Sequence, residues 1–190
     1  RISQLLIQEK PSVLLNQLQK TEDLAPLFAL KGCEQSPVYH PEGDVWIHTM
    51  HMVDHMAALK LPSEQLLKMM WAALLHDIAK PETWAIRKGR ITNYNHDILG
   101  RKRSYEFLIK LGAPEEFADE VSAIVRWHMQ PYFVSKGYAK MDHMLKEVDT
   151  EDICAIHYCD RLSKGSERIQ NIKSAQAACH QFLTACSMQN

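Results

Sequence analysis

Hydrophobic residues recur every three or four positions along most of this chain, which is the spacing of one face of an α-helix. Leu, Met, Ala, Gln, Glu and Lys are plentiful, and β-branched residues do not form the alternating runs of a half-buried strand. The pattern predicts an all-α fold. With 190 residues and 46% hydrophobic content, the chain can build one core, so we expect a single-domain helical bundle.

Proline, glycine and capping residues divide this pattern into segments. Asp44 is placed to cap a helix that begins at Val45, and Ser63 to cap the next helix. The predicted helices are residues 2–20 with a break at Pro11, 25–30, from 45, 63–78 with Pro81 as the stop, about 98–111, 114 to Pro131, from 150 through 160, and from Gly165 to about 188. Residues 81–97 are expected to be a polar connector, and residues 132–149 are less regular.

We assign residues 1–36 to accessory N-terminal helices, 37–165 to the helical core, and 166–190 to a C-terminal helix packed on that core. Because the chain begins at Arg1, we expect that it can belong to a longer polypeptide. The sequence leaves the oligomeric state open.

Charge and cysteine content exclude several classes of protein. A net charge of -1 argues against a generally basic surface, so we expect no stable coat on DNA. The five cysteines are odd in number and form no CxxC pair, which favours reduced thiols and a cytoplasmic location. No run approaches the roughly 20 apolar residues that cross a bilayer, so we expect no membrane partner.

The dipeptide His76-Asp77 closes an apolar helical stretch, and an adjacent imidazole and carboxylate suit a divalent metal ion. His48 lies one helix earlier, and further ionisable residues follow on later segments. The candidate metal ligands are His48, His76, Asp77, His96, His128 and Asp160. Mixed nitrogen and oxygen ligands suit Mn, Fe, Co, Ni or Zn, and also allow Mg, so we expect one or two divalent ions.

Helical spacing turns two of these groups toward the core, because His128 and Asp160 each continue an apolar stripe of their helix. A buried carboxylate needs a cation, a hydrogen-bond network or a metal. Two simpler alternatives stay open at this point. In one, Asp160 forms a salt bridge with Arg126 or Arg161. In the other, His128 is a core histidine whose ring is satisfied by hydrogen bonds.

Lys80 lies three residues beyond Asp77 on the same helix face, where its ammonium group can meet the phosphate of a substrate. Its alternative role is to complement the helix dipole. His96 and His128 either hold a second metal, with Asp77 as the bridging ligand, or hydrogen-bond the phosphate. Of the basic residues that bracket His96, Arg101 is nearest to this site, and we expect it to contact a polyanion.

A rival metal site lies within one helix. His48, His51 and His55 are spaced by three and four residues, and such a set can bind nickel or zinc at the surface. Met50 and Val53 belong to the core stripe of that helix, which places His51 and His55 nearer to solvent. We therefore favour the site built from several helices.

The order His48, His76-Asp77, Asp160 resembles the HD-domain superfamily of metal-dependent phosphohydrolases, and His96 and His128 match positions that its two-metal members use. The similarity spans about residues 38–165. More narrowly, residues 37–49 (PVYHPEGDVWIHT) and 72–81 (AALLHDIAKP) look like the HD portion of bacterial CCA-adding tRNA nucleotidyltransferases. The nucleotidyltransferase head has no counterpart here, so only the HD activity is implied.

The resemblance implies hydrolysis of phosphomonoesters or phosphodiesters, including 2′,3′-cyclic phosphates at RNA ends, with Asp77 and Lys80 as catalytic residues. The expected substrate is a nucleotide or an RNA end, bound by Lys80, Arg101, His96 and His128. Met129 stands where cyclic-dinucleotide phosphodiesterases carry a second histidine, and Ala79 stands where glycine is frequent. The competing hypothesis is a non-catalytic helical module that holds RNA or another partner for a larger protein, with a structural metal.

Overall fold

The computed structural model describes residues 1–137, 141–165 and 168–188. Within these ranges it confirms the all-α prediction, because the only strands form one short hairpin. The helices are α1 (Ile2–Leu6), α2 (Pro11–Leu15), α3 (Ala25–Phe28), α4 (Val45–Ala58), α5 (Ser63–Leu75), α6 (Lys80–Thr83), α7 (His96–Lys110), α8 (Glu115–Trp127), α9 (Gln130–Ser135), α10 (Met141–Met144), α11 (Thr150–Leu162) and α12 (Arg168–Ser187). The strands are β1 (Ala85–Arg87) and β2 (Arg90–Thr92). None of the helices in these ranges is long and apolar enough to cross a bilayer.

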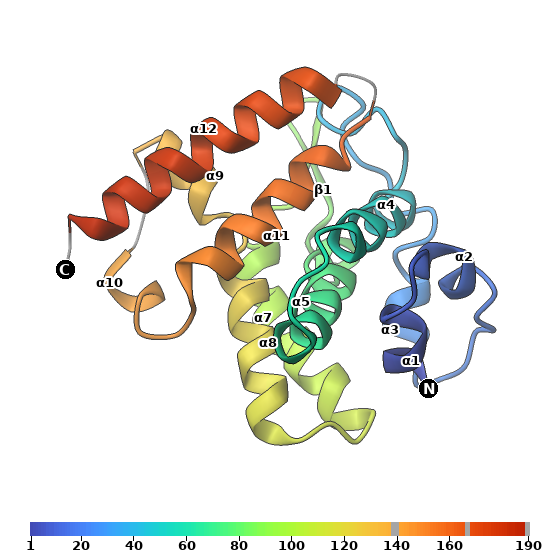
Figure 1. Ribbon diagram of the computed structural model, residues 1–190. Coiled ribbons are helices and arrows are strands. Elements are labelled where there is room, and N and C mark those ends of the chain that lie inside the picture. The colour runs from blue at the N-terminus through green and yellow to red at the C-terminus, as the bar shows by residue number, and fades with distance from the viewer. Residues whose placement is uncertain (138–140, 166–167, 189–190) are drawn as a thin grey trace.

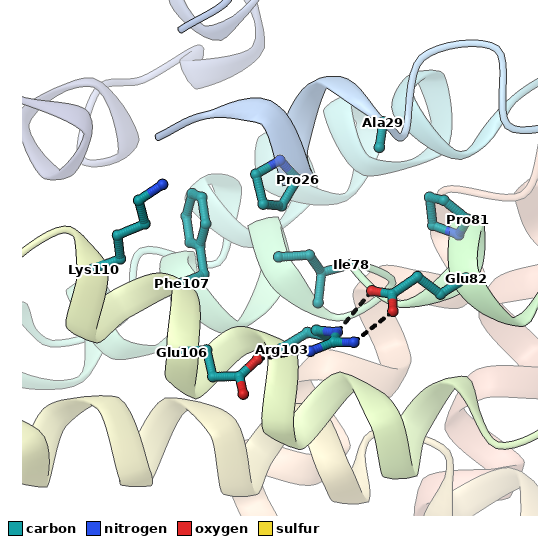
Figure 2. A pocket seen from close by; sticks show the side chains of 9 residues that line it. All are labelled: Pro26, Ala29, Ile78, Pro81, Glu82, Arg103, Glu106, Phe107 and Lys110. Atoms are coloured by element: carbon teal, nitrogen blue, oxygen red, sulfur yellow. Dashed lines mark hydrogen bonds and ion pairs between the residues drawn. The ribbon is translucent and has the colours of Figure 1, made fainter. Parts of the chain in front are cut away.

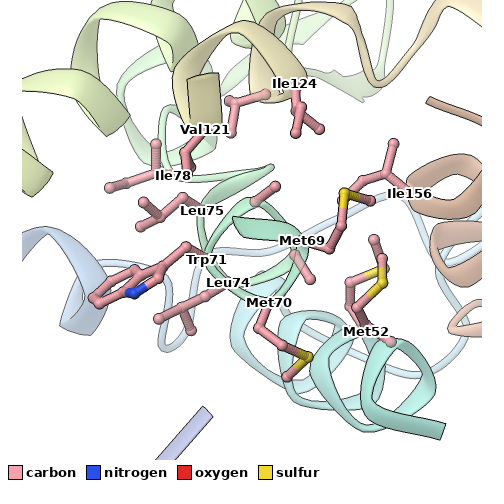
Figure 3. Packing of buried hydrophobic residues seen from close by; sticks show 14 of the residues in the cluster. Met52, Met69, Met70, Trp71, Leu74, Leu75, Ile78, Val121, Ile124 and Ile156 are labelled. Atoms are coloured by element: carbon pink, nitrogen blue, oxygen red, sulfur yellow. The ribbon is translucent and has the colours of Figure 1, made fainter. Parts of the chain in front are cut away.

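Helix α5 occupies the centre of the bundle, where it packs against α1, α4, α8 and α11 (Figure 1). Its residues 69–75 are all buried, because every side of this segment meets a neighbouring helix. Figure 3 shows Met52 of α4 and Ile156 of α11 close to Met69 of α5. The turn that follows α5 is therefore attached to the most completely buried helix of the fold.

The remaining helices surround this centre. Helices α7 and α8 pack along each other, and α12 lies along α11 and α9 (Figure 1). The short helices α1 to α3 sit at one end, where the backbone amide and hydroxyl of Ser12 donate to the Asp54 carboxylate of α4 at 3.0 and 2.7 Å. Trp46 of α4 also donates to Asn16 at 2.8 Å. The division of the chain after residues 36 and 165 stays a prediction.

The boundaries of α5 differ from the prediction. Ser63 is the first residue of the helix and makes no capping hydrogen bond, because Pro62 stands at the N-cap. The helix ends at Leu75, before Ile78. Pro81 does not stop α5; it lies in the first turn of α6, where its missing amide hydrogen leaves no helical bond unmade.

Residues 81–97, expected to be a connector without strands, contain the β1–β2 hairpin, in which Ile86 pairs with Ile91. Its turn is Lys88-Gly89, and both residues have positive φ (50° and 72°), as a type I′ turn requires. Strands of three residues are too short to show alternation in the sequence. Helix α7 then begins at His96, earlier than the predicted start near residue 98.

The less regular stretch at residues 132–149 contains most of α9 and all of α10, and part of it, residues 138–140, lies outside the described residues. Pro131 lies in the first turn of α9, so it starts this helix; α8 already ends at Trp127. The first residues expected of the last helix, 166 and 167, also lie outside the described ranges.

Truncation of Leu74 tests the central position of α5. The Leu74 side chain is fully buried, so Leu74→Ala should lower the free energy of unfolding by about 2–5 kcal/mol, as expected for a cavity in a packed core. Leu183→Ala in α12, where the residue is 40% exposed, should lower it by less than about 1 kcal/mol. Urea denaturation followed by circular dichroism measures both, and equal losses would contradict the core position of α5.

Candidate metal centre

Helix ends and the turns beside them meet on one side of α5. Asp44 caps α4 as predicted, since its carboxylate accepts from the backbone amide of Ile47 at 2.8 Å. The residues that these ends bring together are His48 in the first turn of α4, His76 and Asp77 in the turn after α5, His96 at the start of α7, His128 directly after α8 and Asp160 in the last turn of α11. All are buried apart from a small exposed part of His96.

These six side chains form two clusters, each with its donor atoms within 4.8 Å of one another. The first cluster is His48, His76 and Asp160, and the second cluster is Asp77, His96 and His128. Ligands that lie about 2.1 Å from a metal ion are at most about 4.2 Å apart, so each cluster needs only a small contraction to hold an ion.

The Nδ1 atoms of all four histidines donate hydrogen bonds. The Nδ1 acceptors are Ala73 O for His76 (2.8 Å), Asn93 O for His96 (2.7 Å), Val125 O for His128 (2.7 Å) and Glu42 Oε1 for His48 (2.7 Å). Carbonyl and carboxylate oxygens only accept, so Nδ1 carries the proton and, in the neutral ring, Nε2 keeps its lone pair. Metal-binding histidines are usually held in this way.

The Nε2 atoms of His76 and His96 face the carboxylate of Asp77. The Nε2 atom of His76 is buried without a hydrogen-bond partner, and it lies 3.1 Å from Asp77 Oδ2. The other oxygen of Asp77 lies 3.5 Å from His96 Nε2, so one carboxylate faces both clusters. A lone pair opposite a carboxylate is unfavourable unless a cation lies between them. The donor set therefore fits a divalent metal, with Asp77 placed as a shared ligand.

The carboxylates of the two clusters are ionised at neutral pH. Burial alone would raise the pKa of Asp77, but the neighbouring His76 and Lys80 side chains outweigh it and hold this pKa well below its usual range. Burial likewise opposes ionisation of Asp160, whose pKa is held low by Lys164 and by the hydrogen bond to His48. Both acids can thus act as anionic ligands.

Two of the imidazoles are neutral for the same electrostatic reasons. Burial and the neighbouring His96 ring lower the pKa of His128 to about 3, and burial also lowers the pKa of His96. His48 behaves differently: burial lowers its pKa, but the carboxylates of Asp160 and Glu42 outweigh burial and raise it. Without a metal, His48 therefore takes up a proton more readily than His96 or His128.

Glu42 is a functional residue that the sequence did not reveal. Its Oε1 accepts from His48 at 2.7 Å and from His40 at 2.8 Å. Burial raises the pKa of Glu42, but these two hydrogen bonds lower it to about 2, so the residue is a carboxylate. It lies in a turn between Pro41 and Gly43, and its proximity to His48 depends on how that turn folds back over α4. No spacing in the sequence marks it.

Lys80 lies beside the shared carboxylate. Its Nζ is 2.7 Å from Asp77 Oδ2 and donates to Gln35 Oε1 at 2.6 Å. The side chain is only 6% exposed, so the ammonium group is held in one place. Gln35 is a second contact that the sequence did not indicate.

A cavity of about 310 Å³ opens onto both clusters, and Asp77, Lys80, His96, His128 and Asp160 line it. Further lining residues that the sequence had not assigned to the site come from the same face of α11 and just beyond it: His157, Arg161 and Lys164. The part of the wall that carries Asp160 is thus also rich in nitrogen-containing side chains.

The salt bridge expected for Asp160 has a different partner. Its Oδ2 lies 3.0 Å from Lys164 Nζ, one turn further along, and its Oδ1 lies 2.9 Å from His48 Nε2. The predicted partners are wrong, because Arg126 pairs with Asp97 and Arg161 donates to Ser174.

Three other sequence candidates lie outside the two clusters. Arg101 is ion-paired with Glu147 at 2.6 Å, with Asp119 at 3.5 Å, and does not line the cavity. Among the described residues, His51 and His55 join no cluster of three potential ligands, so the single-helix metal site is not formed. The expected contact of Arg101 with the substrate finds no support in this position.

A second cavity, of about 340 Å³, lies between α3, α6 and α7 (Figure 2). Its lining is largely apolar, and Arg103 is held there by Glu82 at 2.7 Å and by Glu106 at 2.9 Å. Because the charges of Arg103 are matched by these acids and neither metal cluster borders the cavity, it offers no comparable chemistry.

Residues 45–165 match the family model of the HD domain, which is more than half of the chain. The chain belongs to the HD domain family. This range contains all six residues of the two clusters, so the HD domain is the part of the chain that carries the candidate centre. The resemblance inferred from the sequence is confirmed at the level of the family.

Several curated relatives of this HD domain carry the name Multifunctional CCA protein. The relative from Halorhodospira halophila is 32% identical over 131 residues, which cover 67% of this chain and 30% of the relative. The relative from Neisseria gonorrhoeae is 32% identical over 153 residues, which cover 77% and 35%. The chain thus spans about a third of the length of the relatives it matches.

Replacement of Glu42 tests its role in holding His48. Glu42→Gln keeps the size of the side chain but removes the charge opposite the ring, and it should weaken Mn²⁺ binding about 10- to 100-fold. Isothermal titration calorimetry measures the affinity, and a circular dichroism melt checks the fold. Glu64→Gln, a neutralisation in the first turn of α5, is the matched control. Unchanged affinity in Glu42→Gln would show that this hydrogen bond does not orient the ligand.

Proposed function

We propose that this HD domain is a metal-dependent phosphohydrolase. His48, His76, Asp77 and Asp160 would hold one divalent ion, and Asp77, His96 and His128 would hold a second. The observation that carries the proposal is the convergence of histidine Nε2 atoms on the Asp77 and Asp160 carboxylates at the edge of an open cavity. A purely structural metal would not need the cavity.

When bound, the ions would supply positive charge that favours loss of a proton from water and polarises the phosphoryl oxygen. The remaining roles would belong to residues of the chain itself. Lys80, fixed by Asp77 and Gln35, would donate to a phosphoryl oxygen and stabilise the negative charge that develops there. Water adds to phosphorus, the bond to the leaving oxygen breaks, and that oxygen takes up a proton. His96 and His128, if they hold no metal, would instead hydrogen-bond the phosphate.

The proposed substrate class is a nucleotide or an RNA end, such as one with a 2′,3′-cyclic phosphate. The likeness to the HD portion of CCA-adding enzymes supports this class, together with the cationic residues Lys80, Arg161 and Lys164 around the cavity. The alternative is a non-catalytic helical module with a structural metal that binds RNA or another partner. Turnover on a small substrate separates the two.

A hydrolysis screen tests the proposal directly. Wild-type protein loaded with Mn²⁺, Co²⁺ or Ni²⁺ should hydrolyse at least one of three classes: 2′,3′-cyclic nucleotides, nucleoside monophosphates and generic phosphodiesters. Asp77→Ala should lose at least about 100-fold in kcat/KM, because both clusters lose their shared anion. Metal analysis should show less bound ion. Asp142→Ala, at an exposed acid of α10, is the control.

Equal turnover in wild type and Asp77→Ala would remove the mechanism. Stoichiometric metal without turnover on any class would favour the non-catalytic module.

Activity should fall as the pH drops through about 6, because histidine binds metal only in its neutral form. The raised pKa of His48 makes it protonate before His96 and His128, and His128, with a pKa of about 3, is still neutral at that pH. A pH profile of kcat/KM measures this, and a higher metal concentration should move the midpoint to lower pH. A maximum below about pH 5 in metal-saturated buffer would contradict neutral histidine ligation.

A further inference from the structure

Three exposed tyrosines line the cavity that opens onto the metal clusters. Tyr39 precedes α4, Tyr94 follows β2 and Tyr132 belongs to α9, and they are 66%, 63% and 43% exposed. Aromatic rings of this size are normally buried, so three of them at one opening need an explanation. Exposed aromatic side chains are the surfaces on which unpaired nucleic-acid bases stack.

The β1–β2 hairpin brings positive charge to the same opening. Its cations Arg87, Lys88 and Arg90 are all exposed, and in the described part of the chain none of them forms an ion pair. Other arginines of the chain, such as Arg101 and Arg103, are by contrast paired with carboxylates, at 2.6 and 2.7 Å. The hairpin thus carries uncompensated charge on a chain whose net charge is only -1.

The hairpin and the cavity are physically continuous. Ile91, Asn93 and Tyr94, at the end of β2 and just after it, line the cavity. The Arg87 guanidinium lies 4.7 Å from the centre of the Tyr94 ring, so the cation and the exposed aromatic face form one surface. Asn93 also has a side-chain oxygen, Oδ1, that is buried without a hydrogen-bond partner.

We propose that the cationic hairpin (Arg87, Lys88, Arg90) and the three tyrosines form a binding rim for single-stranded RNA, so that the chain acts on the end of a polynucleotide. The proposal rests on the proposed function, and it specifies the substrate. The terminal phosphate would enter the cavity, preceding bases would stack on the tyrosines, and preceding phosphates would meet the hairpin. A mononucleotide has no preceding phosphates, so the hairpin would not affect it.

Binding without turnover is the first test. A 5′-fluorescein hexauridylate with a 3′-hydroxyl end has no terminal phosphate to hydrolyse, and fluorescence anisotropy measures its affinity for the metal-loaded protein. Arg87→Gln/Lys88→Gln/Arg90→Gln should weaken binding at least tenfold at low salt. It should also reduce the slope of log K against log salt by about 2, since each phosphate contact on a single strand contributes about 0.7. The control Lys20→Gln/Lys102→Gln/Lys110→Gln removes equal charge elsewhere and should bind like wild type.

Turnover provides the second test. For an oligoribonucleotide with a 2′,3′-cyclic phosphate, the hairpin variant should raise KM about tenfold or more and leave kcat unchanged. For the corresponding 2′,3′-cyclic mononucleotide, kcat/KM should stay within twofold of wild type. Tyr94→Ala should weaken oligonucleotide binding roughly tenfold, whereas Tyr94→Phe keeps the stacking face and should bind normally.

Wild-type affinity and salt slope in the hairpin variant would overturn the proposal, as would an equal loss on the mononucleotide. If the variant loses salt-dependent binding while no substrate turns over in any form of the protein, the rim stands and the hydrolase assignment fails. If a DNA hexamer binds equally well, the rim accepts single strands of both RNA and DNA, and its restriction to RNA is wrong. Circular dichroism and metal content confirm that each variant is folded and loaded.

Discussion

The candidate centre depends on the hydrogen bonds that the histidine Nδ1 atoms donate. His76 and His128 each follow directly after a helix and bond the carbonyl three residues earlier, which is one of the acceptors that a helix end leaves without a partner. One contact therefore satisfies the helix end and selects the ring tautomer. Because α5 and α8 are held by the core, the two Nε2 atoms have fixed positions before any ligand arrives.

Small residues allow the helix ends around the candidate centre to approach one another closely. Ala72 and Ala73, small residues one turn before His76, are fully buried. Gly100 in α7 serves the same purpose, because an added Cβ would lie 3.1 Å from a Val125 methyl of α8 and 3.9 Å from the carbonyl oxygen of His76. The carboxylates of Asp77 and Asp160 are buried among these helices, so their charges need the nearby cations Lys80 and Lys164.

Much of this arrangement could be predicted from the sequence, because helical periodicity and the residues beside each helix are local signals. The six ligand candidates follow from such signals, as does the cap at Asp44. Glu42 could not be found, since it contacts His48 only through the fold of a turn. The strands of the β1–β2 hairpin are too short for the sequence to show the alternation of apolar and polar residues that predicts a strand. The pairing of Asp160 with Lys164 could have been predicted, because helical residues four positions apart are neighbours. Arg101 was expected near the site because it is close to His96 in the sequence, but sequence separation does not determine the direction in which a side chain points.

The contact between His48 and Asp160 joins residues that are 112 positions apart. An ion bound to both would stabilise the folded state, because only folding brings these distant residues together into a site. The five cysteines are free thiols, so no disulfide contributes to that stability. Occupancy of the centre would then govern how long the whole domain resists unfolding and proteolysis, and metal supply would control the lifetime of the protein as well as its chemistry.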